Sequence, residues 1–193
     1  GMQGTPYIYQ GEELGMTNVQ YDIEDYKDCE IINMYHERLE KGYSKDEIMK
    51  SIYAKGRDNA RTPMQWDDSA NAGFTTGTPW IKVNDNYDKI NAKSQVDDPD
   101  SIFSCYKKLV QLRKDYPVFV DGKFTLLLED DENIAYSRKN EEKTMIVVCN
   151  FFDKEIPMSL AKECEGMEVL ISNYKDTSDM SVLRPYEARM YIR

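Results

Sequence analysis

The segment 55–67, KGRDNARTPMQWD, holds the densest group of side chains that could recognise a ligand. Arg57 and Arg61 stand beside Asp58, and Trp66 follows within five residues of the second arginine. Sugars are recognised by polar groups at their hydroxyls and by flat aromatic surfaces under their apolar faces, and this segment supplies both. The alternative is an Arg–Asp network that only holds a loop in shape. We take Arg61 and Arg57 as candidate sugar-binding residues.

Two adjacent carboxylates, Glu12 and Glu13, are the other candidates for sugar chemistry. Hydrolysis of a glycosidic bond needs two carboxylates that flank the bond, about 5–5.5 Å apart for retention and about 6.5–9.5 Å for inversion. Neighbouring residues of an extended chain project to opposite faces, so this pair cannot flank one bond. The sequence therefore predicts no catalytic residue here, although either carboxylate could line a binding pocket.

Other chemistries have no motif in this sequence. The single histidine, His36, falls inside a predicted helix with no cysteine or aspartate at a spacing suited to a metal site or a catalytic triad. The sequence also contains no GxGxxG, GxxxxGK[ST] or HExxH pattern. We therefore expect neither a metal nor another cofactor.

The charge and composition limit the possible partners and the compartment. A formal net charge of -10 argues against nucleic-acid binding, which needs clustered Lys and Arg, and leaves a neutral sugar compatible. No apolar run approaches the ~20 residues of a membrane span, so no membrane partner is expected. Four widely spaced cysteines without a CxxC pattern favour reduced core thiols and a cytoplasmic location.

The positions of apolar residues and turn signals predict the elements that carry these groups. We expect a buried strand over 4–9, a helix over 28–41 that ends at Gly42, and a second helix to about residue 55 whose capping box joins Ser44 to Glu47. We expect residues 56–98 to form a long functional loop and residues 100–117 to form a further helix.

Beyond residue 122, short apolar runs alternate with turn segments at spacings near ten residues, which is typical of an antiparallel β-sandwich. The turns include DDEN, KNEEK and NYKDTSD. The predicted fold class is therefore α+β, with a mixed part over 1–118 and an all-β domain over 119–193.

The motifs resemble, in order, the C-terminal third of family 13 glycoside hydrolases of the oligo-1,6-glucosidase and trehalose-6-phosphate hydrolase type. TPYIYQGEELGM (5–16) resembles the eighth strand of their (β/α)8 barrel and the turn that follows it, and GRDNARTPMQWD (56–67), with NAGFT (71–75) and Pro79-Trp80, resembles the loop after that strand. The helix over 100–117 resembles the last barrel helix. Residues 122–193 resemble the small β-sandwich called domain C.

The resemblance implies a remnant of the last barrel strand and helices followed by domain C. The whole chain would be a fragment of a retaining α-glucosidase that hydrolyses α-glucosidic bonds, such as α-1,6, in short oligosaccharides or disaccharides. By resemblance, Arg61 borders the glucose subsite, Arg57 lies nearer the acceptor side, and Glu12 or Glu13 is a carboxylate at the mouth. The family's catalytic carboxylates lie on strands four, five and seven, upstream of the matched motifs, so the chain alone should be inactive.

Two interpretations outside catalysis stay open. Apolar edges at the strand over 4–9 and the helix over 100–117 could support self-association, which makes a homo-oligomeric interaction module possible. The β domain could instead bind carbohydrate if its aromatic side chains were exposed, but their strand pattern favours the core. These aromatic residues are Tyr136, Phe151, Phe152, Tyr174, Tyr186 and Tyr191.

Overall fold

The computed structural model describes residues 1–129 and 133–193, so most of the predicted DDEN turn lies outside the described residues. The chain forms two compact units, one made of residues 7–106 and the other of residues 1–6 with 107–193. The predicted division at residue 118 stays a prediction. Within the described residues, no helix has both the length and the apolar character needed to cross a bilayer.

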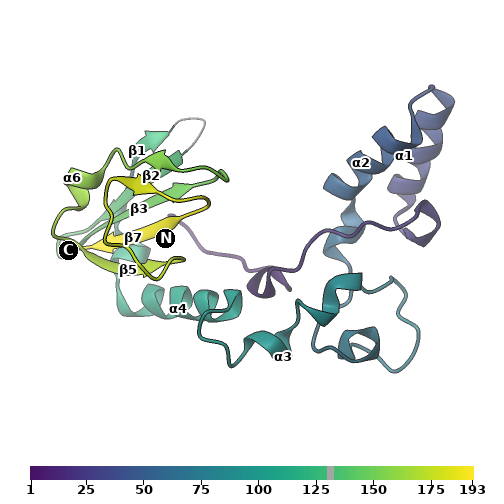
Figure 1. Ribbon diagram of the computed structural model, residues 1–193, viewed down its shortest axis with the longest axis horizontal. Coiled ribbons are helices and arrows are strands. Elements are labelled where there is room, and N and C mark those ends of the chain that lie inside the picture. Colours follow the sequence, from purple (N-terminus) through teal and green to yellow (C-terminus); the bar gives the residue numbers. More distant parts are fainter. Residues whose placement is uncertain (130–132) are drawn as a thin grey trace. The chain divides into compact units, whose positions relative to one another are not determined.

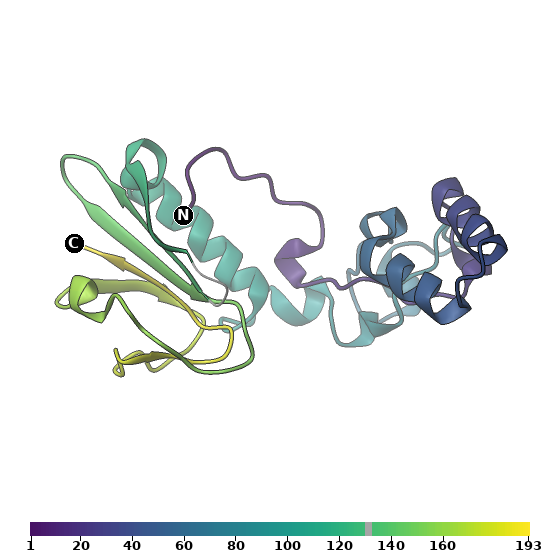
Figure 2. The same ribbon diagram turned by 90° about the horizontal axis from the view of Figure 1, so that it is seen from above.

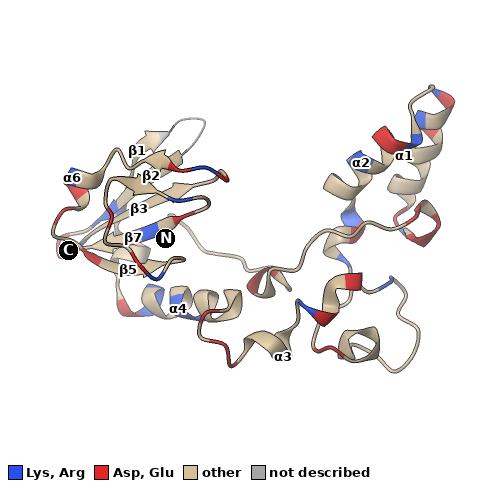
Figure 3. Cartoon of the chain, in the orientation of Figure 1, with Lys and Arg blue, Asp and Glu red and all other residues tan. Residues whose placement is uncertain are grey.

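The unit of residues 7–106 is built on a helical hairpin, α1 (Cys29–Glu40) and α2 (Lys45–Lys55) (Figure 1). Gly42 has a φ of 85°, and Ser44 and Glu47 form the predicted capping box before α2. Acidic and basic residues are interspersed along both helices (Figure 3). Residues of both helices and of the flanking segments form one core of nine buried residues: Val19, Tyr21, Tyr26, Ile31, Tyr35, Ile48, Met49, Ile52 and Ile81.

The long segment after α2 is a folded loop rather than a flexible linker. Short helical turns punctuate it: η3 (Arg57–Ala60), η4 (Ala70–Gly73), η5 (Asp85–Asp88) and α3 (Ala92–Gln95). Two similar turns, η1 (Glu12–Leu14) and η2 (Ile23–Asp25), precede the hairpin. Ile81 of the loop lies in the same core as the hairpin residues, which fixes the loop to the helices.

The predicted strand over residues 4–9 is wrong. These residues form no strand, and the side chain of Tyr7 is 91% exposed. A strand is held by ladder hydrogen bonds to neighbouring strands, and this segment has no neighbouring strand among the described residues. Residues 4–9 therefore have the composition of a strand but do not form one in this chain.

The second unit is an antiparallel sheet covered by α4 (Ile102–Asp115), of which residues 107–115 belong to this unit (Figure 2). The five-stranded sheet has the order β1-β2-β3-β7-β5, and all of its pairings are antiparallel. Its strands are β1 (Lys123–Glu129), β2 (Asn133–Lys139), β3 (Thr144–Asn150), β5 (Glu168–Ser172) and β7 (Ala188–Ile192). The smaller sheet pairs β4 (Ile156–Pro157) with β6 (Val182–Leu183), and the short helices α5 (Val118–Asp121) and α6 (Ala161–Cys164) complete the unit.

The alternation along β3 places side chains on both faces of the large sheet. Met145 and Val147 join the core that includes Leu112 of α4, whereas Ile146 and Val148 join a second core. That second core also contains residues of the small sheet, which gives both faces of β3 a buried environment. The expected α+β class is confirmed in these elements.

Candidate functional site

The two candidate arginines lie in one ionic cluster with two buried carboxylates, which we call the arginine cluster: Asp28, Arg57, Asp58 and Arg61. Asp28 caps the N-terminus of α1 and accepts a hydrogen bond from the backbone N–H of Glu30. Arg57 and Asp58 open η3, and Arg61 follows its last residue. The cluster therefore joins the start of the first helix to the start of the long loop.

The contacts within the arginine cluster are well defined. Arg57 donates to Asp28 through Nε to Oδ2 at 2.6 Å and through Nη2 to Oδ1 at 2.8 Å, which is the bidentate arrangement that suits guanidinium and carboxylate. Arg61 Nη1 lies 3.3 Å from an oxygen of Asp28 and 3.3 Å from an oxygen of Asp58. Asp58 Oδ2 also accepts the backbone N–H groups of Lys27 and Asp28, at 2.7 and 3.0 Å.

The electrostatics of the arginine cluster favour a neutral ligand. The hydrogen bond from Arg57, more than any other contact, lowers the pKa of Asp28 to about 2, and the same bond raises the pKa of Arg57. The positive charges of the two arginines are cancelled by the negative charges of Asp28 and Asp58. Glu30 Oε1 also lies 3.2 Å from Arg57 Nη2, so no excess positive charge remains to bind a phosphate.

The arginines of the cluster are exposed although their carboxylate partners are buried. The side chains of Arg57 and Arg61 are 51% and 39% exposed, whereas those of Asp28 and Asp58 are each 1% exposed. Each guanidinium keeps N–H groups that the contacts to Asp28 and Asp58 do not use. The guanidinium groups are held in place by the carboxylates and can therefore donate their remaining hydrogen bonds to hydroxyl groups.

The structure separates the two neighbours Gln65 and Trp66, which the sequence grouped as ligand-recognising residues. Gln65 is fully buried, and its Nε2 donates to Asn86 Oδ1 at 3.1 Å and to the backbone oxygen of Ile90 at 2.5 Å. Its backbone oxygen accepts from Ala92 at 2.9 Å. Among the described residues, Gln65 Oε1 is buried without a partner. Gln65 therefore holds the loop together, and Trp66 is exposed beside it.

Glu12 and Glu13 lie in the helical turn η1, so they do not have the extended geometry assumed for the pair in judging whether they could flank one bond. Glu12 Oε2 accepts the backbone N–H of Tyr9 at 3.2 Å, and Glu13 Oε2 accepts that of Gly11 at 2.9 Å. Gly11 has a φ of 92°, which glycine adopts without strain and which lets the turn form. Their binding role stays a prediction.

The residues just before the two glutamates contact the helical turn η3, which carries Arg57. The hydroxyl of Tyr9 donates to the backbone oxygen of Ala60 at 2.5 Å, and Ala60 ends η3. The structure thus brings the chain beside Glu12 to the turn that carries Arg57, although it does not bring the carboxylates into the cluster.

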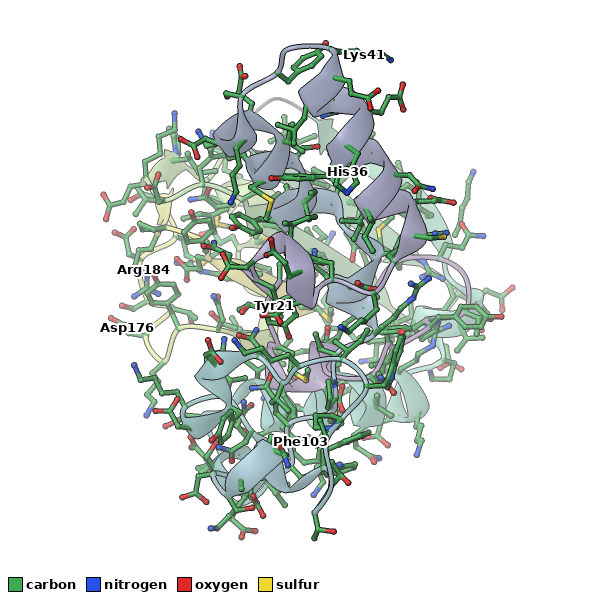
Figure 4. The ribbon with its side chains drawn as sticks, turned by 90° about the vertical axis from the view of Figure 1, so that its right-hand side faces the viewer. Tyr21, His36, Lys41, Phe103, Asp176 and Arg184 are labelled. Carbon is green, nitrogen blue, oxygen red and sulfur yellow. The ribbon has the colours of Figure 1, made fainter. Side chains whose placement is uncertain are left out.

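His36 lies on α1 with its ring edge-on to Tyr35, with ring centroids 5.5 Å apart (Figure 4). Within residues 1–129 and 133–193, no three His, Cys, Asp or Glu side chains are grouped so that they could hold a metal ion. The prediction of reduced core thiols is only partly right, because Cys164 is buried but Cys29 is exposed.

The β-domain aromatics do not all lie in the core, so that prediction is wrong for part of the set. Tyr136 and Tyr191 are buried, whereas Phe151, Phe152 and Tyr186 are exposed. The three exposed rings follow β3 or precede β7, outside the strands whose pattern predicted burial.

Asp28 was not among the predicted site residues. The predicted helix begins at Asp28, but nothing in the sequence connects that start to Arg57, which lies 29 positions further along the chain. An aspartate at the start of a predicted helix, followed by an arginine-rich loop, was the available signal. A single sequence, however, gives no measure of which distant residues meet.

Comparison with known proteins finds relatives that match nearly the whole of this chain. Residues 1–122 match the family model described as the α-amylase catalytic domain. An oligo-1,6-glucosidase of Parageobacillus thermoglucosidasius is 54% identical over 98% of this chain, and a trehalose-6-phosphate hydrolase of Bacillus subtilis is 47% identical over 98%. The match covers 35% of each of these proteins, so the chain spans about a third of their length.

A solved structure also matches this chain over about a third of its own length. The trehalose-6-phosphate hydrolase of Bacillus licheniformis superposes with a TM-score of 0.92 and is 47% identical over 98% of this chain, which corresponds to 36% of that protein.

Proposed function

Because the chain belongs to the α-amylase family, we propose that it forms the substrate-closing third of a retaining α-glucosidase. The expected fold, a remnant of a (β/α)8 barrel followed by antiparallel sheets, agrees with the family match over residues 1–122 and with the described sheets. In this proposal, residues 55–67 border the sugar, and the β unit stabilises the assembly.

The observation that carries the proposal is the arginine cluster. Two half-exposed guanidinium groups are held by two buried carboxylates, and the loop that bears them is fixed by Gln65. This arrangement presents oriented N–H donors at fixed positions, which is what recognition of sugar hydroxyls requires. Arg57 and Arg61 are the proposed substrate-binding residues, with Glu12 and Glu13 as lesser candidates at the mouth.

The proposed substrate is a short oligosaccharide or disaccharide with an α-glucosidic bond, such as α-1,6. Charge cancellation within the arginine cluster supports an uncharged ring at this position, whether or not the substrate carries a phosphate elsewhere. The catalytic carboxylates are proposed to lie in parts of the barrel that match none of these residues, so we assign no catalytic residue here.

A chimera tests the proposal. This chain would replace the C-terminal third of the Parageobacillus thermoglucosidasius oligo-1,6-glucosidase, its relative at 54% identity, and isomaltose hydrolysis would be measured. We expect activity, and we expect Arg57→Ala and Arg61→Ala each to lower kcat/KM by at least about tenfold, since a hydrogen bond from a charged group contributes about 1.5–3 kcal/mol.

The matched control is Arg38→Ala, which removes a partly exposed arginine from the last turn of α1. We expect it to leave kcat/KM unchanged. A chimera that folds and hydrolyses isomaltose equally well with and without Arg57 and Arg61 would contradict the proposed role of the cluster.

A second candidate function is self-association of the isolated chain. The exposed side chains of Tyr7, Ile8 and Tyr9 support it, because adjacent large apolar groups on a surface favour contact with another chain. In this alternative the chain acts as a homo-oligomeric binding module without catalysis.

The compartment and the sheet architecture are finer proposals. We propose a cytoplasmic location, because the four cysteines form no disulfide in the described part of the chain. We also interpret the two sheets of the β unit as the β-sandwich of domain C, since residues of both share one core.

A further inference from the structure

A concave site of about 380 Å³ lies within the unit of residues 7–106, and none of the predicted site residues lines it. We call it the Trp80 pocket. Its volume falls at the lower end of the ~300–1,000 Å³ range of small-molecule sites. Its lining residues include the aromatic Trp80 and Tyr87, the polar Asn71, and charged residues of both signs.

Exposed and buried residues alternate along the segment that carries Trp80. Ile81 and Val83 are buried, whereas Trp80 is 63% exposed and Lys82 also faces outward. The hydroxyl of Tyr21, a core residue labelled in Figure 4, donates to the backbone oxygen of Lys82. The indole of Trp80 therefore projects from a fixed backbone.

The opposite side of the Trp80 pocket is shaped by a strained turn. Asn71 and Ala72 have φ values of 55° and 56°, in the left-handed region that residues with a Cβ seldom occupy. The amide of Asn71 donates to the backbone oxygens of Thr75 at 3.2 Å and Gly77 at 3.0 Å, which fixes the chain that leads to Trp80. Strain that is held in place by such contacts is common at binding sites.

The charges around the Trp80 pocket cancel, which selects a neutral ligand. Lys27 and Lys82 are balanced by Asp25 and Asp85, and Lys82 Nζ lies 3.8 Å from Asp85 Oδ1. A phosphate site would need a positive excess, and a purely apolar ligand would leave these polar groups without partners. A polyhydroxyl ring with one apolar face satisfies both the aromatic and the polar lining.

The Trp80 pocket adjoins the arginine cluster through the backbone. Lys27 lines the pocket, and its N–H donates to Asp58 Oδ2 at 2.7 Å; the next residue is Asp28. A chain of sugar rings could therefore extend from one site toward the other.

We propose that the Trp80 pocket binds a glucosyl unit of a neutral oligosaccharide, as a subsite additional to the arginine cluster. The identity of the sugar rests on the proposed function, whereas the pocket, its charge balance and its aromatic platform do not. Trp80 stacks on the apolar face of the ring, and the charged groups bind its hydroxyls.

The chain offers a direct readout, because it contains two tryptophans. Trp66→Phe leaves Trp80 as the sole tryptophan, which removes any signal from Trp66 in the proposed sugar-binding segment. Titration of this 193-residue variant with isomaltotriose should change its fluorescence saturably.

Isothermal titration calorimetry on the unmodified chain and on Trp80→Ala supplies the second measurement. We expect Trp80→Ala to weaken isomaltotriose binding by about tenfold or more, where each factor of ten corresponds to about 1.4 kcal/mol. Because Trp80 is exposed, its removal should leave the thermal unfolding midpoint near that of the unmodified chain.

Three outcomes would overturn the proposal. These are the absence of both saturable fluorescence change and binding heat, equal affinities of the unmodified chain and Trp80→Ala for isomaltotriose, and tighter binding of trehalose 6-phosphate than of isomaltotriose. The chimera separates this failure from that of the proposed function. Isomaltose hydrolysis without a Trp80 response rejects only the pocket, whereas a Trp80 response in a folded but inactive chimera rejects only the α-glucosidase assignment.

Discussion

Asp28 has three structural roles that act through one carboxylate. It caps α1, it binds Arg57 through two hydrogen bonds, and it contacts Arg61. Its burial makes these partners necessary, because an unpaired carboxylate away from water is strongly destabilising. The position of both candidate arginines therefore depends on one residue outside their own loop.

Asp28→Asn separates the ionic role from the capping role, since asparagine caps helices about as well as aspartate does. We expect it to lower the free energy of unfolding by about 2 kcal/mol, the contribution of hydrogen bonds to a charged group. Urea unfolding measures the change. The control Asp22→Asn alters an exposed aspartate that makes no side-chain cap. Equal midpoints for the two variants would contradict the account.

Acid should destabilise the chain through the same residue. Arg57 lowers the folded-state pKa of Asp28 to about 2 from an ordinary 3.8, so folding favours the ionised form. The resulting stabilisation is fully present above about pH 4 and decreases as the pH falls toward about 2. The urea midpoint should therefore fall over this interval, and less steeply in Asp28→Asn. A midpoint independent of pH would contradict the prediction.

The β unit also contains a buried carboxylate, Glu187, whose contribution to stability depends on pH in the same way as that of Asp28. Burial raises the pKa of Glu187, but hydrogen bonds from Arg184 and Arg189 outweigh it and lower the pKa to about 2. Its stabilisation is likewise lost as the pH falls below its ordinary 4.5.

At the scale of elements, the sequence predicted best where local signals decide the structure. The capping box at Ser44 and Glu47, the turn at Gly42 and the helix ended by Pro117 all depend on neighbours within a few residues. The strands β1, β2, β3, β5 and β7 followed from alternation and turn spacing. The short strand β6 was not predicted, because two residues carry no period.

Prediction failed where an element depends on distant partners. The apolar run over 4–9 has strand composition but no paired strand in this chain, so it remains irregular and exposed. The roles of Asp28 and Gln65 in fixing the loop were not predicted for the same reason, since their contacts join positions 21–33 residues apart. Arg57 and Arg61, in contrast, could be selected from residue types within one short motif.

The turn before β7 contains local strain that can be relieved. Tyr186 has a φ of 53° and is exposed, and a residue with a Cβ is disfavoured in this conformation by about 1–2 kcal/mol. Tyr186→Gly should therefore be more stable than Tyr186→Ala by about 1 kcal/mol, which thermal unfolding can resolve. If the alanine variant proves equally stable, the strain is absent.

At the scale of the whole molecule, the exposed apolar segment over 7–9 should cause self-association of the isolated chain. We expect sedimentation velocity to detect dimers or larger species, and Tyr7→Ser with Ile8→Ser to reduce them. Tyr9 is retained because its hydroxyl contacts Ala60. The control Tyr43→Ser alters another exposed ring, at the end of the helical hairpin. A monomer at all concentrations would exclude the interaction module.

The central claim is that these 193 residues bind and enclose the sugar without supplying the catalytic carboxylates. The most direct test is hydrolysis of p-nitrophenyl α-glucoside by the purified chain at high protein concentration. The account predicts no release of nitrophenol. Clear release that is lost in Glu12→Gln or Glu13→Gln would contradict it, because the turn η1 would then supply a catalytic carboxylate.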